Sequence, residues 1–559
     1  QLQQGMTTSL GTDNTLGDAL DLSGLVAHYR FEGNTLDETG TYAGTAADAP
    51  TYTDDVAQAT AEDALIVRVN ASVSAGAGNG TSWTNAHAAL QDGLTGTGPE
   101  SEVWIAAGTY TPTRQLDAGD ARTATFEITG AQDGLGLYGG FDGTETTRSE
   151  RDPSANETIL SGDIGTAGDA SDNAYHVLVL NGGDGIGANS ADNITPSTVL
   201  DGLTITGGNA NVSFPNNVGG GLYCDGEGSG NACSSSLTGL TFTGNAADFG
   251  GAIFNSGESD GESSPVITNA TFTGNAASSW GGAIYNRGTN GESSPVITNA
   301  TFTGNAANAL GGAIYSSGRS GGTSSPQITN ATFIGNSAGS VGGAIYFFGD
   351  NGSIAAQVTN SVFVSNGADH IGFDAGNAGE QPRFVSSTFT GATDFAFDVR
   401  FYDSEQPPIE LVNSVLWDNG PGGIAGTSGS VADPDAAVDV TFSVVEEARY
   451  AEGSGDPNRG VVRSDGEAGD TYADGDDPLK IVEESVVDLG IESGRLLVDD
   501  RMWARFTQDL REILPKADFG LASDVLGPLR VCKDDAELDA LRRAGEVADA
   551  AMQDVRDLG

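Results

Sequence analysis

The feature of this 559-residue sequence that most limits its fold is an internal repeat in its middle. Residues 268–277 recur unchanged at 298–307, and a variant occupies 329–338. Because one unit of this size cannot bury its own apolar face, neighbouring repeats must stack on one another. One phenylalanine marks each repeat, with spacings of 30, 30, 31 and 30 residues: Phe242, Phe272, Phe302, Phe333 and Phe363. A second marker, Gly-Gly-Ala-Ile, begins at Gly250, Gly281, Gly311 and Gly342.

The segments between these markers have the composition of short β-strands. Residues 266–272 and 283–285 are rich in β-forming residues, and Gly-Asn or Gly-Gly interrupts such runs before a helix could form. A leucine-rich horseshoe would need helical segments and a leucine spacing that these repeats lack. The sequence therefore predicts a mainly β fold over about residues 65–450, a right-handed parallel β-helix of the pectin-lyase-like type. A small α/β fragment is expected after it.

Stacking places each residue next to its copy one rung away, at about 4.8 Å. We therefore expect the phenylalanines to stack inside the β-helix and a column of asparagines to satisfy the amides of the turns. This predicted column consists of Asn245, Asn275, Asn305, Asn336 and Asn366. Asn269, Asn299 and Asn330 begin Asn-x-Thr triplets, which are glycosylation acceptors, but their repeat position favours a ladder role. The glycine pairs permit a positive φ at the corner between strands.

The two ends of the chain differ from the repeats. Trp83, Ala86, Leu90 and Leu94 have the spacing of an amphipathic helix that would cap the first rung. Glycine and aspartate are abundant in residues 451–477, which predicts an acidic linker. The sequence thus predicts four parts, namely residues 1–64, 65–450, 451–477 and 478–559. The last part contains all three lysines of the chain, Lys480, Lys516 and Lys533.

The formal net charge of −53 limits the classes of partner. Such a surface repels phosphate, so nucleic-acid binding is not expected, and binding to an anionic membrane is disfavoured. A solvated acidic surface, as in proteins from salty environments, accounts for the charge, and binding of Ca²⁺ is the alternative. The sequence contains no run of 18 apolar residues, so we expect no transmembrane segment.

Two of the three cysteines, Cys224 and Cys233, flank a glycine-rich loop at residues 225–232. Their spacing permits a small loop closed by a disulfide, which would fit an oxidising compartment. It permits two free thiols equally well. Cys532 lies apart from them, in the last part of the chain.

The central repeats resemble a known family. The pair Phe-x-x-Asn and Gly-Gly-Ala-Ile is the repeat signature of polymorphic outer membrane proteins, a family of bacterial surface β-helices and adhesins. Residues 82–86, 104–113, 137–145, 158–163 and 201–209 are similar to the opening turns of secreted bacterial β-helix proteins. The resemblance implies the fold and an extracellular or cell-surface location, and it leaves the chemistry open.

Each end of the chain resembles a different family. Residues 25–34 are similar to the first strand of laminin-G and concanavalin-like modules, although residues 1–64 are too few for that jelly roll. Residues 495–503 and 529–539 resemble the N-terminal domain of creatinase and Xaa-Pro aminopeptidases, which implies a strand near 496–498 and helices near 502–513 and 535–556. In that family the metal ligands and catalytic histidines belong to the following domain. Because no histidine occurs after His370, the resemblance implies a non-catalytic piece, and Xaa-Pro peptidase activity is a remote alternative.

Few residues suggest catalysis. The four histidines, His28, His87, His176 and His370, have no metal-ligand spacing, and no nucleophile elbow or phosphate-binding loop occurs. Parallel β-helices that cleave polysaccharides need two carboxylates beside the sugar bond, or a cluster that binds Ca²⁺. The weak candidates for such a site follow Asn366 and are Asp394, Asp398 and Arg400.

The leading hypothesis is a secreted or surface-displayed protein with a structural and adhesive role and no catalysis. Loops at 257–264, 288–294 and 318–325 would form an extended face of serine, glycine and acidic residues. A surface glycan, a protein or another copy of the chain would be the ligand. The alternative is a carbohydrate-active enzyme, a polysaccharide lyase or glycosidase, with no cofactor or with Ca²⁺.

Overall fold

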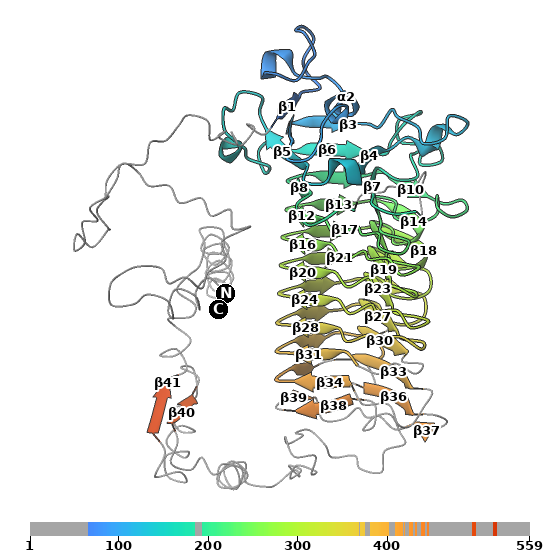
Figure 1. The fold of residues 1–559 in the computed structure, drawn as a ribbon. Coiled ribbons are helices and arrows are strands. Elements are labelled where there is room, and N and C mark those ends of the chain that lie inside the picture. Colours follow the sequence, from blue (N-terminus) through green and yellow to red (C-terminus); the bar gives the residue numbers. More distant parts are fainter. Residues whose placement is uncertain are drawn as a thin grey trace, which may run out of the picture. The chain divides into compact units, whose positions relative to one another are not determined.

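The computed structural model describes residues 65–184, 193–367, 369–374, 381–401, 409–417 and 419, and short strands within 424–445 and at 495–498 and 518–521. Its main body is a right-handed parallel β-helix, in which the chain passes repeatedly through the same sheets (Figure 1). In the central coils the order along the chain is sheet 1, sheet 2, the short sheet 3 and sheet 4. The predicted fold class is therefore confirmed.

The long sheets 1, 2 and 4 pair each strand with the strand of the next coil. Sheet 1 contains twelve parallel strands: β1 (Ile66–Val69), β2 (Glu102–Ala106), β5 (Gly136–Phe141), β8 (Val199–Asp201), β12 (Ser236–Thr238), β16 (Val266–Thr268), β20 (Val296–Thr298), β24 (Gln327–Thr329), β28 (Gln357–Thr359), β31 (Arg383–Val385), β34 (Ile409–Val412) and β38 (Val438–Thr441). Sheet 2 contains eleven: β3 (Gly108–Tyr110), β6 (Thr158–Ser161), β9 (Thr204–Thr206), β13 (Thr241–Thr243), β17 (Thr271–Thr273), β21 (Thr301–Thr303), β25 (Thr332–Ile334), β29 (Val362–Val364), β32 (Thr388–Thr390), β35 (Val415–Trp417) and β39 (Val444–Val445).

Within the described residues, sheet 3 occurs only in the central coils. It contains β10 (Asn209–Ala210), β14 (Ala246–Phe249), β18 (Ala276–Trp280), β22 (Ala306–Ala307) and β26 (Ser337–Ala338). Sheet 4 contains β4 (Phe126–Thr129), β7 (Leu178–Asn181), β11 (Leu222–Asp225), β15 (Ile253–Ser256), β19 (Ile284–Arg287), β23 (Ile314–Ser317), β27 (Ile345–Phe348), β30 (Ile371–Asp374), β33 (Phe397–Phe401), β36 (Ile424–Ser428) and β37 (Val431–Ala432). The last pair, β36 and β37, is antiparallel.

The core follows from the alternation of side chains along each short strand. In sheets 1 and 2 the middle residue of a central strand, such as Ile267 or Phe272, is fully buried, and its two neighbours are partly or fully exposed. In sheet 4 all four residues of β15 are buried, because Ile253 faces the interior and Phe254 lies under an aromatic cluster on the outer face. Burial on both faces is typical of parallel sheets.

A stack of phenylalanines runs through the interior on sheet 2. Neighbouring rings from Phe242 to Phe389 lie 4.6–5.1 Å apart between centroids and are within 9° of parallel. The stack therefore follows the strand spacing of a parallel sheet. Each buried ring contributes about 1.5–3 kcal/mol through apolar burial.

The buried asparagines after sheet 2 form a continuous hydrogen-bonded column. Nδ2 of Asn275 donates to Oδ1 of Asn305 at 3.0 Å and to the carbonyl of Phe242 at 2.9 Å. The same pair of bonds recurs at Asn305 and Asn336, so each of these amides uses both of its hydrogens. Oδ1 in turn accepts from the backbone N–H of the preceding asparagine, which satisfies a buried turn amide.

His370 continues this column where the repeat lacks an asparagine. Ala392 occupies the third position after Phe389, where earlier repeats have asparagine. The fully buried His370 accepts from Asn366 through Nδ1 at 3.1 Å and donates from Nε2 to Oδ1 of Asn419 at 3.1 Å. The histidine thus bridges the two parts of the column in its neutral form.

The Gly-Gly corners are required by close contact between rungs. Gly281 has φ of 68°, a left-handed conformation that side chains rarely adopt. A Cβ on the next residue, Gly282, would lie 2.1 Å from the carbonyl oxygen of Gly312 on the following rung. The corner therefore needs both glycines, the first for its backbone angle and the second for space.

The predicted cap helix over residues 83–94 is wrong as a single helix. The structure has a 3₁₀ helix, η1 (Trp83–Asn85), and one short α-helix, α2 (Leu90–Leu94). Between them His87 pairs with sheet 1, where its N–H donates to the carbonyl of Arg68 and its carbonyl accepts from Asn70. These bonds extend the first rung and interrupt the helix. Leu90 and Leu94 are nevertheless buried against the first strands.

Beyond the β-helix the structure describes one strand pair, β40 (Arg495–Val498) and β41 (Asp518–Leu521), which are parallel. β40 lies where the sequence predicts a strand. The predicted helices at 502–513 and 535–556, the linker at 451–477 and the segment 1–64 all lie outside the described residues. Three further 3₁₀ helices, η2 (Ala121–Thr123), η3 (Gly130–Gln132) and η4 (Arg148–Glu150), belong to the loops of the first coils.

Candidate functional site

The outer face of sheet 4 carries a column of aromatic side chains. Phe254, Tyr285, Tyr315 and Tyr346 occupy the same register position on β15, β19, β23 and β27. Their rings contact one another, with centroids 5.1, 4.9 and 5.5 Å apart. Because the inward neighbours are isoleucines of the core, strand alternation directs these rings outward.

Sheet 3 and the corner after it build one wall along this aromatic column. Phe249, Trp280, Leu310 and Val341 pair with one another on successive rungs. The Trp280 ring stacks on Tyr315, with centroids 5.2 Å apart and planes inclined by 14°. Phe249 contacts Trp280 at 5.2 Å. This wall is therefore apolar and aromatic.

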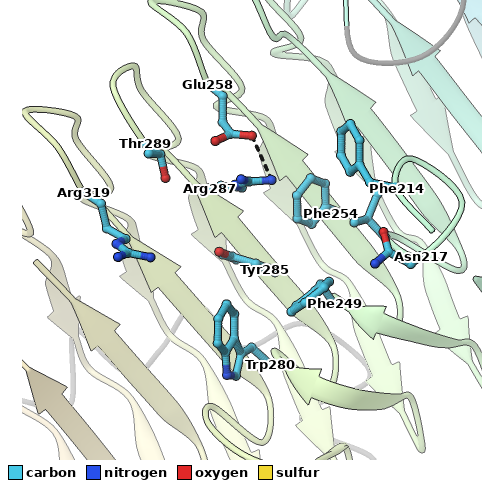
Figure 2. Close-up of a pocket in the computed structure, with 11 residues that line it drawn as sticks. Phe214, Asn217, Phe249, Phe254, Glu258, Trp280, Tyr285, Arg287, Thr289 and Arg319 are labelled. Carbon is cyan, nitrogen blue, oxygen red and sulfur yellow. Dashed lines mark ion pairs between the residues drawn. The ribbon is translucent and has the colours of Figure 1, made fainter. Parts of the chain in front are cut away.

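The loops after sheet 4 build the opposite, polar wall. Glu258, Thr289 and two arginines lie there, across the groove from Phe249 and Trp280 (Figure 2). Arg287 pairs with Glu258 at 2.8 Å. Arg319 lies over the ring of Phe348 at 4.9 Å, and its distance to Asp350 is 3.9 Å.

Between the walls lies a groove of about 370 Å³, within the size range of small-molecule sites. Phe214 and Asn217 line it at the end nearest the N-terminus, and Phe214 is 45% exposed. We call this site the aromatic groove. Its lining consists of Phe214, Asn217, Val218, Phe249, Phe254, Glu258, Trp280, Tyr285, Arg287, Thr289 and Arg319.

Burial shifts the titration of two groups in the groove. Desolvation raises the pKa of Tyr285 to about 12, so its hydroxyl remains protonated at neutral pH. Burial also raises the pKa of the Glu258 carboxyl, and the neighbouring Arg287 opposes this shift. Arg287 and Arg319 are the only arginines or lysines between Arg151 and Arg383 in the sequence, so the groove concentrates positive charge in an acidic chain.

The candidates for a polysaccharide-cleaving site do not meet in this groove. Asp394 is exposed in the loop before β33, and Asp398 lies half-buried on β33 itself. The side chain of Arg400 lies outside the described residues. Of the residues that line the groove, Glu258 is the one carboxylate, whereas glycosidases flank the sugar bond with two. Within the described part of the chain, no three histidine, cysteine or acidic side chains are grouped to hold a metal ion.

The asparagines of the Asn-x-Thr triplets and the cysteines Cys224 and Cys233 have structural roles in the β-helix. Asn269, Asn299, Asn330 and Asn360 form an exposed ladder, with Nδ2 to Oδ1 distances of 3.0, 3.0 and 2.7 Å. Glycosylation at Asn299 or Asn330 would modify an amide nitrogen that donates in this ladder. Cys224 and Cys233 form a disulfide in the interior, beside the core of sheet 4.

The predicted loop face and the histidines His176 and His87 belong to the regular coils of the β-helix. The loops that follow sheet 4 stack through paired residues at Glu262, Glu292 and Thr323, with Ser259 and Asp260 exposed at the first tip. His176 is buried and its Nδ1 lies 3.1 Å from the carbonyl oxygen of Gly219. His87 belongs to the backbone pairing of the first rung, and His28 lies outside the described residues.

Sequence reasoning missed the aromatic groove, although one signal for it was present. An aromatic residue follows each Gly-Gly-Ala-Ile, at Phe254, Tyr285, Tyr315 and Tyr346, with spacings of 31, 30 and 31. An aromatic residue next to an inward isoleucine on a short strand must face outward. No periodic spacing pointed to the arginines, because Arg287 and Arg319 do not occupy equivalent positions in the repeat.

The fold and the groove define a parallel β-helix with an external aromatic site. Three segments of its central coils, residues 269–287, 299–317 and 330–347, match the family model of the Chlamydia polymorphic membrane protein repeat. Each segment runs from the exposed asparagine ladder through sheets 2 and 3 into sheet 4. The central coils are therefore similar to the repeats of that family.

Searches of curated proteins and of solved structures found no match to the chain. Among the described residues, no helix has the length and apolar character needed to cross a membrane. The resemblance of residues 1–64 to laminin-G modules and of 478–559 to the creatinase N-terminal domain stays a prediction.

Proposed function

We propose that this chain is a secreted or cell-surface β-helix protein with a structural and adhesive role, which binds its ligand in the aromatic groove without catalysis. The observation that carries the proposal is the groove itself, an open site with the half-buried rings of Phe249 and Trp280 on one wall, the exposed Phe214 at one end and charged groups on the other wall. Concave sites lined by aromatic side chains and a few charged groups are the usual form of ligand-binding sites.

Two further observations support a location outside the cytoplasm. The match to polymorphic membrane protein repeats favours a place at the cell surface. The Cys224–Cys233 disulfide fits an oxidising compartment, because cytosolic thiols are kept reduced.

The chemistry of the groove favours binding over cleavage. Arg287 neutralises Glu258 at 2.8 Å, and no second carboxylate is among the lining residues of the groove. An acid and a base for sugar-bond cleavage would need two carboxyl groups with different environments. Aromatic rings and arginine are the residue types that dominate binding energy at interfaces.

Removal of whole repeats tests the adhesive role. Deletion of residues 272–332 joins Thr271 to Phe333, which restores the Thr-Phe pair of sheet 2 and removes Trp280 and both arginines. We expect the shortened protein to fold, because coils of one repeat contact only their neighbours. Beads coated with it should lose attachment to a panel of glycan-coated and protein-coated surfaces, whereas beads with the full chain attach.

Attachment equal to that of the full chain would overturn the proposal. Circular dichroism and a melting curve establish that the shortened chain is folded. If it does not fold, the full-length double variant Trp280→Ala and Arg319→Gln takes its place in the same assay.

A further inference from the structure

The charge of the aromatic groove differs from that of the rest of the chain. Its lining contains Arg287, Arg319 and Glu258, and Asp350 lies 3.9 Å from Arg319, so the groove is close to neutral in a chain of net charge −53. A guanidinium that is exposed in such a site is complementary to a ligand that carries an isolated anionic group. A highly charged polyanion would be repelled by the surrounding acidic loops.

The two arginines are not equivalent. Arg287 is 32% exposed and holds Glu258 at 2.8 Å, a distance typical of a charge-assisted hydrogen bond. Arg319 is 44% exposed, and the 3.9 Å to Asp350 is too long for a hydrogen bond. The Phe348 ring supports the flat face of the Arg319 guanidinium at 4.9 Å, which leaves its N–H edge for planar recognition of a carboxylate.

The apolar wall provides a second kind of recognition. Trp280 is partly exposed, and its ring is held by stacking on Tyr315 and by contact with Phe249. The C–H face of a sugar ring packs on such an aromatic face, and the sugar hydroxyls then point toward the polar wall. Thr289 lies on the polar wall and carries a hydroxyl group for these sugar hydroxyls.

We propose that the aromatic groove binds a mainly neutral glycan that bears a single carboxylated sugar, with one sugar ring on Trp280 and the carboxylate on Arg319. This inference rests on the proposed function and names its ligand class. The neutral sugars contact the aromatic wall, and the one carboxylate meets the exposed guanidinium of Arg319.

Two oligosaccharides that differ only in one carboxylated branch test whether the groove recognises the carboxylate. A xylo-oligosaccharide with one glucuronate branch and the unbranched oligosaccharide of the same length are titrated into the full-length chain by calorimetry. The branched probe should bind roughly tenfold more tightly, a difference of about 1.4 kcal/mol, because its carboxylate adds a charge-assisted hydrogen bond to Arg319. Equal affinity for the two probes, or no binding of either, would overturn the proposal.

Point variants test the contact of the carboxylate with Arg319 and the contact of the sugar ring with Trp280. Arg319→Gln should weaken the branched probe by about tenfold and leave the unbranched probe unchanged. Trp280→Ala should weaken both probes, and Trp280→Phe should restore part of the affinity. Arg383→Gln is the matched control, because Arg383 is 42% exposed, pairs with Glu410 and does not line the groove. Loss of affinity in the control equal to that in Arg319→Gln would contradict the assignment.

Failure of this inference can be told from failure of the proposed function. An acidic peptide of the same charge is the competing ligand, and its tighter binding at the groove would reject the glycan while leaving an adhesive groove in place. If the groove variants also left bead attachment unchanged, the proposed function itself would fail.

Discussion

His370 shows how one buried side chain keeps the asparagine column continuous. It connects Asn366 to Asn419 across the coil in which Ala392 stands at the asparagine position. We predict that His370→Leu lowers the free energy of unfolding by about 2–4 kcal/mol, because a buried N–H of Asn366 loses its acceptor and Oδ1 of Asn419 loses one donor and keeps the backbone N–H of Ala392. Chemical denaturation measures this, and His370→Gln, which retains a donor and an acceptor, should recover part of the loss. A loss below ~0.5 kcal/mol would contradict the bridging role.

Because His370 and His176 are both buried in their neutral form, we predict that the folded protein loses stability in acid. Burial lowers the pKa of each to about 4, whereas an exposed histidine in the unfolded chain titrates near 6.5. The unfolded state therefore binds protons first, and stability contributed by the neutral side chains is lost as pH falls from about 6.5 to 4. Each histidine accounts for roughly 3 kcal/mol across this window. His370→Gln should flatten the dependence of unfolding free energy on pH there, and an unchanged slope would exclude this cause.

At the scale of elements, the corner between sheets 3 and 4 decides how closely the rungs approach. We predict that Gly282→Ala costs about 3 kcal/mol or more, because its Cβ would meet the Gly312 carbonyl oxygen at 2.1 Å. Gly304→Ala is the matched control, since φ there is 61° but no atom lies within 4 Å of the added Cβ. It should cost only about 1–2 kcal/mol for the left-handed backbone. Equal melting temperatures for the two variants would show that the rungs yield to the extra atom.

For the whole molecule, the net charge of −53 makes stability depend on salt. Like charges on the folded chain repel one another, and salt shortens the range of that repulsion from about 10 Å at 0.1 M to 3 Å at 1 M. We predict that the melting temperature of the β-helix rises by roughly 5–10 °C over this range of sodium chloride. Sucrose at matched osmolality is the control, because it leaves charge repulsion unscreened. A melting temperature that falls with salt would contradict this account.

The sequence by itself determined the parallel β-helix and the residues that share a column. A repeat of nearly constant length returns the chain to the same place one rung later, so residues at equivalent positions of neighbouring repeats contact one another. That is why the phenylalanine stack and the asparagine column follow from residue numbers alone. The short strands followed as well, because glycine and asparagine interrupt each β-forming run.

Only the tertiary structure decided the features that depend on departures from the repeat. The groove joins residues of unlike repeat position, such as Trp280 and Arg319, through walls that no periodicity predicts. His370 enters the column because the folded coil places it beside the gap at Ala392. The predicted cap helix is interrupted because the backbone of His87 pairs with sheet 1, through hydrogen bonds to Arg68 and Asn70, in place of helical partners. In each case the outcome depends on competition for a partner in space, which a local sequence pattern does not contain.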